Sequence, residues 1–120
     1  MYRILLVDDD HDFRLMLKKL LEKNGYEVMD ATNGIEALHL FQQYPARVVI
    51  TDIIMPDMDG IETIIEMRKK YPDTVLIAIS GGGRIGPVSY LNAARALGAA
   101  KILTKPFPNE ELLKLLKEYE

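Results

Sequence analysis

Short apolar runs alternate with stretches of helical periodicity along the whole of this 120-residue chain. Apolar runs of strand length occupy residues 4–7, 26–29, 48–50, 75–79 and 101–103. In the intervening stretches apolar side chains recur every three or four residues, which is the spacing of one helix face. Five strand-helix units in alternation predict an α/β fold, in which a parallel sheet with right-handed crossovers carries helices on both faces.

Apolar positions and stop signals delimit the expected helices. The apolar positions are Phe13, Met16, Leu17, Leu20 and Leu21 in the first helix, Ala37, Leu38 and Phe41 in the second, and Ile61, Ile64, Ile65 and Met67 in the third. Residues 90–97 and 110–119 form the fourth and fifth. Asn24-Gly25 is a typical helix stop, and Tyr44-Pro45 closes the second helix. The six methionines form no stripe of their own, so we expect them in core or loop packing.

The composition is that of one folded domain spanning residues 1–120. A chain of this length buries a core without disulfides, and its 48% hydrophobic content is ordinary. It has no cysteine, no apolar segment of membrane-spanning length and no signal-peptide pattern. We therefore expect a soluble, cytoplasmic protein without membrane insertion. The net charge of −3 argues against direct nucleic-acid binding and favours protein partners.

Acidic residues and one lysine stand where the expected strands end. Asp8, Asp9 and Asp10 follow the first strand, Asp52 follows the third, and Lys105 follows the fifth. The carboxyl ends of parallel strands meet at one edge of an open sheet, where ligands of such folds bind. Carboxylates this close raise one another's pKa unless a cation joins them, so the sequence predicts a divalent metal at this edge.

These features resemble the receiver domain of two-component response regulators. The resemblance rests on Val7-Asp8-Asp9-Asp10, on Thr51-Asp52-Ile53-Ile54-Met55-Pro56-Asp57-Met58-Asp59-Gly60, on Ser80 after an apolar strand, and on Lys105-Pro106-Phe107. It covers essentially the whole chain, with the motifs in the family's order. It implies the flavodoxin-like (βα)5 fold, with a five-stranded parallel sheet of strand order 2-1-3-4-5.

The resemblance also implies a phosphorylation site with a metal ion. Asp52 is then the phosphoacceptor, a carboxylate that attacks the phosphorus of a phosphohistidine or a small acyl phosphate. Asp9 and Asp52 are the expected direct ligands of Mg²⁺ (or Mn²⁺), and Asp8 is an outer or water-bridged ligand. The backbone carbonyl of Ile54 is expected to add a further oxygen.

Lys105 and Ser80 complete the site that the resemblance implies. Lys105 is expected to contact a carboxylate before transfer and a phosphoryl oxygen afterwards, with a cis peptide bond to Pro106. The hydroxyl of Ser80 is expected to move toward the phosphoryl group and act as a switch. In the family an aromatic residue three positions before the lysine swings inward with it, but this position holds Ile102, which has no ring. Tyr90 is a weaker substitute, since a single helical tyrosine usually packs.

A glycine run is the second departure from the family pattern. Gly81, Gly82 and Gly83 lengthen the connection before the fourth helix, and we expect them to reshape the face of that helix and the fifth strand, the family's usual output surface. The run lacks the nucleotide-binding pattern GxxxxGK[ST], and Arg84 is its nearest base. Neither Ile54 nor Gly82 positions an attacking water, which predicts slow or moderate self-dephosphorylation.

Other polar residues have structural interpretations. Asp10 is expected to cap the first helix, and Asp57 and Asp59 to serve as turn and cap residues before the third. His11 and His39 lack a spaced second ligand, so we place both on helix surfaces and assign neither to a metal or relay.

Three alternative functions differ in class. A metal-dependent phosphatase would use Asp8 as nucleophile with Asp10 as second acid, but the chain offers no spare segment for a substrate cap. A flavin-binding electron carrier would need a Ser/Thr-rich phosphate loop where this chain has three aspartates. A receiver-like interaction module that is not phosphorylated natively would not need Asp52, Ser80 and Lys105 together.

The implied partners are proteins. A sensor histidine kinase or histidine phosphotransfer protein would donate the phosphoryl group, and a downstream protein or fused output domain would read it. The chain would be a signalling phosphoacceptor rather than an enzyme, a monomer with dimerisation on phosphorylation left open. It ends with its last helix, so we expect either a stand-alone regulator or a domain of a larger protein.

Overall fold

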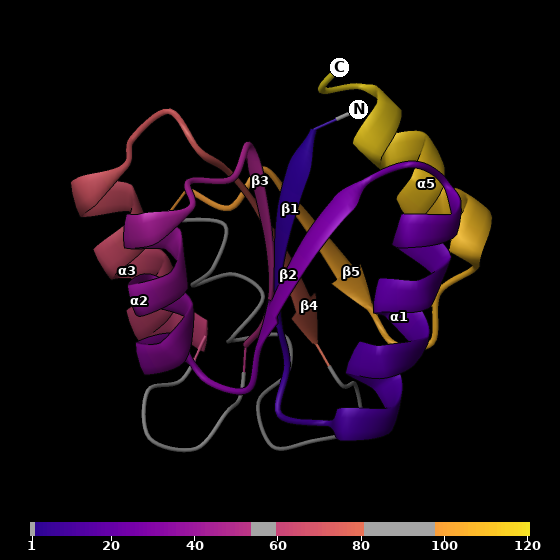
Figure 1. Ribbon diagram of the computed structural model, residues 1–120, viewed down its shortest axis with the longest axis horizontal. Coiled ribbons are helices and arrows are strands. Elements are labelled where there is room, and N and C mark those ends of the chain that lie inside the picture. The colour runs from indigo at the N-terminus through magenta and orange to yellow at the C-terminus, as the bar shows by residue number, and fades with distance from the viewer. Residues whose placement is uncertain (1, 54–59, 81–97) are drawn as a thin grey trace.

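The protein is a five-stranded parallel sheet covered by helices. The computed structural model describes residues 2–53, 60–80 and 98–120. They form β1 (Arg3–Val7), α1 (His11–Lys23), β2 (Glu27–Ala31), α2 (Gly34–Gln43), β3 (Val48–Asp52), α3 (Gly60–Lys70), β4 (Val75–Ser80), β5 (Lys101–Thr104) and α5 (Asn109–Lys117) (Figure 1). The strand order β2-β1-β3-β4-β5 confirms the predicted flavodoxin-like order. The helix predicted over residues 90–97 lies outside the described residues.

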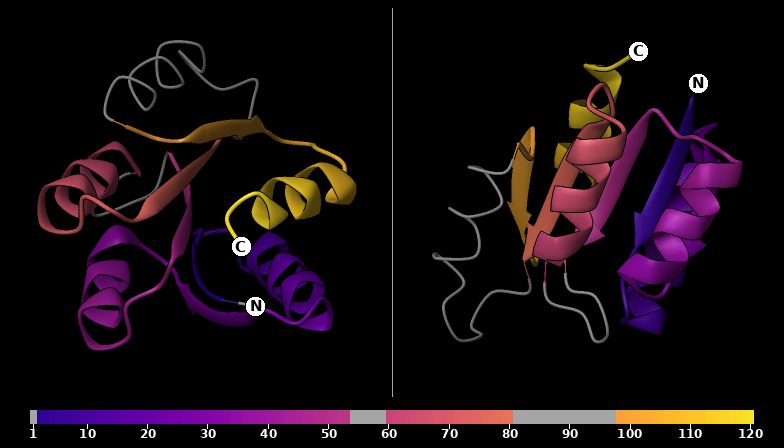
Figure 2. Two further views of the ribbon diagram at one scale, coloured as in Figure 1. Left: turned by 90° about the horizontal axis from the view of Figure 1, so that it is seen from above. Right: turned by 90° about the vertical axis from the view of Figure 1, so that its left-hand side faces the viewer.

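The helices cover the sheet from two sides. Figure 2 shows α1 and α5 on one face of the sheet and α2 and α3 on the other. Successive side chains of a strand point to opposite faces, so each strand serves both cores. On β1, Ile4 and Leu6 join the core under α1 and α5 with Leu17, Leu21, Leu112 and Leu116. Leu5 and Val7 join the core under α2 and α3 with Ala37, Phe41, Ile64 and Met67.

The inner face of α1 differs from the one expected from the sequence. The expectation of core or loop packing was wrong for Met16, whose side chain is 51% exposed on this helix. Arg14 is buried instead, together with Leu17 and Leu21. Positions 14, 17 and 21 follow the i, i+3, i+7 spacing of one helix face, and position 16 lies beside that face.

Side-chain caps fix the starts of two helices. Asp10 Oδ1 accepts the backbone N–H of Phe13 at 3.1 Å, which confirms the structural interpretation of Asp10. Asn33 Oδ1 accepts the N–H of Glu36 at 2.9 Å and begins α2 in the same way. α1 ends before Gly25, whose φ of 95° glycine adopts without strain.

Removal of the α2 cap is expected to destabilise the fold modestly. The Asn33→Ala variant leaves an N–H of the first turn without its side-chain acceptor, and we expect the free energy of unfolding to fall by about 1 kcal/mol. Urea denaturation measures this change. Gln43→Ala, an exposed change at the other end of α2, is the control and should stay within about 0.5 kcal/mol of the parent. Equal unfolding free energies for both variants would contradict the capping role.

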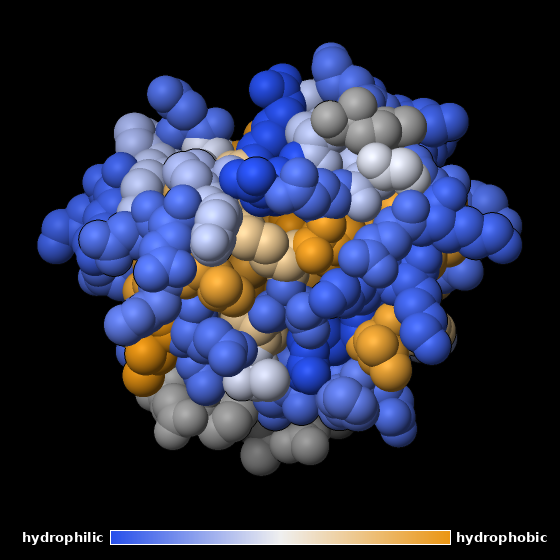
Figure 3. All heavy atoms as spheres, in the orientation of Figure 1, coloured by the Kyte–Doolittle hydropathy of each residue, from blue (hydrophilic) through white to orange (hydrophobic). Residues whose placement is uncertain are grey.

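The surface is mainly hydrophilic. On the face drawn in Figure 3, apolar side chains show in separate places among polar ones. The exposed large apolar side chains of the described residues are Leu15, Met16, Ile35, Tyr44 and Ile65. Among the helices that the structure describes, none combines the length and apolar character needed to cross a bilayer.

Candidate functional site

Three carboxylates meet at the carboxyl edge of the sheet. Asp8 follows β1, Asp52 ends β3, and these strands are neighbours in the sheet. One oxygen from each of Asp8, Asp9 and Asp52 lies within 4.8 Å of the others. Asp8 and Asp52 are buried, at 1% and 8% exposure, while Asp9 is exposed. The convergence predicted from the strand ends is therefore present.

The donor set fits a hard divalent cation. Mg²⁺ binds carboxylate and carbonyl oxygens and retains several waters, and one exposed ligand beside two buried ones leaves a side open to solvent. The Ile54 carbonyl, predicted to be a further ligand, lies outside the described residues. So do Asp57 and Asp59.

Lys105 reaches the carboxylates from β5. Its Nζ donates to Asp8 Oδ2 at 3.1 Å and lies 4.0 Å from the centroid of the Phe13 ring. The Lys105-Pro106 peptide is cis, as the resemblance predicted. The predicted contact between Lys105 and a carboxylate is thus present.

Burial raises the pKa of the Asp8 carboxyl above its ordinary value, although two neighbouring groups stabilise the charged carboxylate. The Asp10 backbone amide donates to Asp8 Oδ1 at 2.9 Å, and the Lys105 ammonium donates to the other oxygen. Both oxygens of Asp8 are thus engaged by protein groups, but the desolvation of its charge is not fully offset. A cation bound beside it would offset more.

Removal of Lys105 is expected to tighten magnesium binding. The Lys105 ammonium donates to Asp8, so it would lie a few ångströms from a bound Mg²⁺ and repel it. Lys105→Met should therefore lower the Kd for Mg²⁺ by about tenfold. Calorimetric titration with MgCl₂ measures this effect. Weaker magnesium binding in this variant would contradict the competition.

Ser80 and Ile102 occupy neighbouring strands near the same edge. Ser80 ends β4, is 3% exposed, and pairs in register with Thr104 of β5. Its backbone carbonyl accepts the amide of Lys105 at 2.8 Å. Ile102 is half-buried and packs against the core under α2 and α3. Tyr90 and residues 81–84 lie outside the described residues.

Gly60 allows the close approach of α3 to the end of β3. Its amide donates to the carbonyl of Ile53 at 2.6 Å. A Cβ at this position would lie 2.0 Å from the Asp52 carbonyl oxygen and 2.3 Å from Ile53 Cα. Only glycine fits this approach without displacement of the backbone that carries Asp52.

Arg14 is a site neighbour that the sequence did not single out. Its Nη1 donates to the Asp8 carbonyl at 2.8 Å, its Nε to Asp30 Oδ2 at 2.9 Å, and its Nη2 lies 3.1 Å from Nδ1 of His11. Partial burial disfavours the Asp30 carboxylate, but hydrogen bonds from Lys18 and Arg14 lower its pKa overall. The spacing with Leu17 and Leu21 was the available signal for a buried arginine. His11 and His39 are exposed on helices, as predicted.

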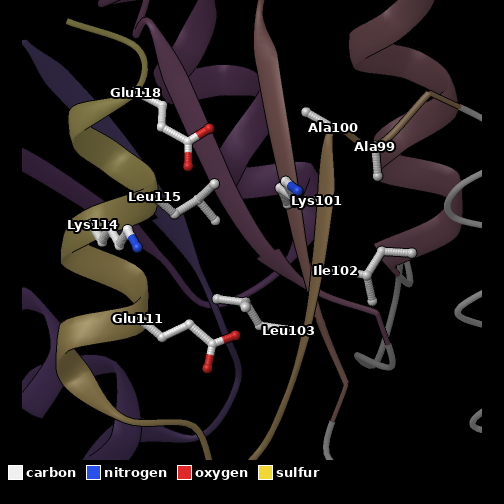
Figure 4. A pocket seen from close by; sticks show the side chains of 9 residues that line it. All are labelled: Ala99, Ala100, Lys101, Ile102, Leu103, Glu111, Lys114, Leu115 and Glu118. Atoms are coloured by element: carbon white, nitrogen blue, oxygen red, sulfur yellow. The ribbon is translucent and has the colours of Figure 1, made fainter.

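A hollow of about 610 Å³ separates β5 from α5. It is lined by residues 99–103 and by Glu111, Lys114, Leu115 and Glu118. Figure 4 shows Leu103 and Leu115 between the two elements, while Ile102 points to the other side of β5. Charges of both signs surround an apolar floor.

Comparison with known proteins gives matches over nearly the whole chain. A sequence model of the response regulator receiver domain matches residues 4–117. The response regulator receiver protein CpdR of Brucella abortus is 38% identical over 98% of this chain and 96% of its own length. The chemotaxis protein CheY of Thermotoga maritima is 38% identical over 97% of this chain and 95% of its own. A crystal structure of a response regulator receiver domain protein from Clostridium thermocellum matches with a TM-score of 0.91 and 30% identity, over 99% of this chain and 94% of that one.

Proposed function

This chain belongs to the response regulator receiver domain family, and from that premise we propose that it is a signalling switch whose phosphoacceptor is Asp52. A phosphorylation-dependent signalling role is common to the family. The observation that supports the choice of residue is the cluster of Asp8, Asp9 and Asp52, in which Lys105 forms an ion pair with Asp8.

The proposed reaction is one in-line phosphoryl transfer. A carboxylate oxygen of Asp52 attacks the phosphorus, the new O–P bond forms, and the N–P bond of a phosphohistidine breaks. The electron pair of the broken bond remains on the ring nitrogen, and the ring leaves as neutral imidazole because its other nitrogen carries a proton. With an acyl phosphate, the acyl O–P bond breaks and a carboxylate leaves.

Magnesium, when bound, would neutralise charge on the transferred phosphoryl group and orient it. Asp9 and Asp52 would hold it, and Asp8 would support it from a buried position. Lys105, which donates to Asp8 Oδ2, would turn to a phosphoryl oxygen after transfer, because its flexible stem carries a compact charge.

The phosphatase alternative assigns the attack to Asp8, and the contacts of that residue oppose it. Asp8 is 1% exposed, and its two oxygens accept from Asp10 and Lys105. Its proposed partner, Asp10, caps α1. These contacts count against Asp8 as the nucleophile, so we keep Asp52 as the proposed phosphoacceptor. Phosphoryl labelling of Asp8 would reverse this choice.

The proposed switch runs from Ser80 to the surface of β5 and α5. Ser80 would donate its hydroxyl to the phosphoryl group, and its carbonyl already accepts the Lys105 amide, so movement of one strand end is transmitted to the next. Ile102 packs against the core and carries no ring, so the transmission would not use an aromatic swing. The hollow between β5 and α5 is the proposed site for a downstream protein.

The test of this function is intact-mass analysis after incubation with acetyl phosphate and MgCl₂. We expect one phosphoryl adduct that hydroxylamine removes, as an acyl phosphate requires, and that maps to the peptide containing Asp52. EDTA should prevent it, because the metal site would be empty. No adduct with acetyl phosphate or a phosphohistidine donor would leave a receiver-shaped interaction module as the function.

A further inference from the structure

The guanidinium of Arg14 holds the turn that carries two of the site's carboxylates. Arg14 is 8% exposed, and its donors reach a carbonyl, a carboxylate and a ring nitrogen in three directions. The contact with the Asp8 carbonyl is buried, at 2.8 Å. A planar fork with several donors is well suited to fix a backbone group relative to a carboxylate.

The Asp8 carbonyl determines where Asp9 lies. The Asp8 amide still donates to Ala31 of β2 at 3.1 Å, so the chain belongs to the sheet up to this point. After it, the peptide between Asp8 and Asp9 turns out of the sheet toward the Asp10 cap. Because a peptide unit is planar, a fixed carbonyl fixes the amide and Cα of the next residue. Arg14 therefore sets the direction in which Asp9 leaves the strand.

We propose that Arg14 is a positioning residue for the magnesium site: through the Asp8 carbonyl it holds the Asp9 carboxylate close to the carboxylate of Asp52. This inference rests on the proposed function, since it assigns Asp9 and Asp52 to the metal. Asp30 anchors the other end of the guanidinium at 2.9 Å and balances its charge. Arg14 thereby connects the two proposed ligands that follow β1 to β2, an edge strand with no proposed ligand of its own among the described residues.

Charge alone predicts the opposite effect of Arg14 on magnesium. A guanidinium near a divalent cation repels it, so loss of the side chain would tighten magnesium binding if charge were its only contribution. If positioning dominates, the same loss weakens binding, because an exposed ligand without a fixed backbone must be ordered by the metal itself. The sign of the change separates the two roles.

The experiment is calorimetric titration of the whole chain with MgCl₂. We expect Arg14→Met, which is similar in length and uncharged, to raise the Kd for Mg²⁺ by about tenfold. Lys18→Met is the matched control: Lys18 donates to the other oxygen of Asp30 at 3.0 Å, so its loss removes a cation from the same pair. In this control the Kd should stay within about twofold of the parent or fall. Asp30 keeps one cationic partner in either variant.

Unchanged or tighter magnesium binding by folded Arg14→Met overturns the proposal while the proposed function stands. If the parent chain itself binds no magnesium in the titration, the metal assignment of the proposed function fails, and this inference fails with it. Circular dichroism establishes folding before each titration. Should Arg14→Met not fold, Arg14→Lys keeps the charge but not the fork, and a Kd equal to that of the parent overturns the proposal.

Discussion

The Asp52→Asn variant is expected to take up no phosphoryl group from acetyl phosphate, a loss of about a thousandfold or more in adduct formation. Asparagine keeps the shape of the side chain, but its neutral amide oxygen is a poor nucleophile. Asp52 is 8% exposed beside two other carboxylates, so the change also removes one charge from a crowded site.

The measurement is intact mass at matched times, with urea denaturation of the same samples to show that the fold is unchanged. Asp12→Asn, an exposed acidic position in the first turn of α1, is the matched control and should form the adduct at the parental rate. An adduct of parental yield on Asp52→Asn would move the phosphoacceptor elsewhere. Asp8 is then the residue to map first.

Much of this site could be predicted because parallel strands impose a common geometry. Strand ends are visible as the last apolar residue of each run, and right-handed crossovers bring those ends to one edge. Asp8, Asp52 and Lys105 each follow such a run, so their meeting needed no knowledge of side-chain contacts. The contact between the Lys105 ammonium and Asp8 depends on which carboxylate oxygens the folded chain leaves accessible, and strand position does not determine that.

Arg14 and Met16 show where sequence periodicity was insufficient. The apolar pattern of α1 admits either residue near its inner face, and hydrophobicity favours methionine. Arginine occupies the buried position because three groups accept from its guanidinium: the Asp8 carbonyl, the Asp30 carboxylate and a ring nitrogen of His11. Such compensation depends on how α1 packs beside the ends of β1 and β2, which helical periodicity does not show, and burial of a charge is favourable only when its partners are present.

The Gly60→Ala variant is expected to lose about 3 kcal/mol of the free energy of unfolding, and its phosphoryl acceptance should slow as well. The added methyl would meet the Asp52 carbonyl oxygen at 2.0 Å and Ile53 Cα at 2.3 Å. Both are backbone atoms, which cannot move aside by a rotamer change, so β3 and α3 must separate locally. Helix propensity alone would favour alanine, so the sign of the effect reports the close approach.

Urea denaturation and the rate of adduct formation, measured on the same preparations, test this expectation. Lys69→Ala, an exposed change on the same helix, is the control and should stay within about 0.5 kcal/mol of the parent. Because the strained atoms belong to Asp52 and its neighbour, the loss of stability and the loss of phosphoryl acceptance should appear together. A Gly60→Ala protein as stable as the parent would show that the β3–α3 approach is wider than described. A less stable protein that is phosphorylated at the parental rate would show instead that Asp52 tolerates displacement of its backbone.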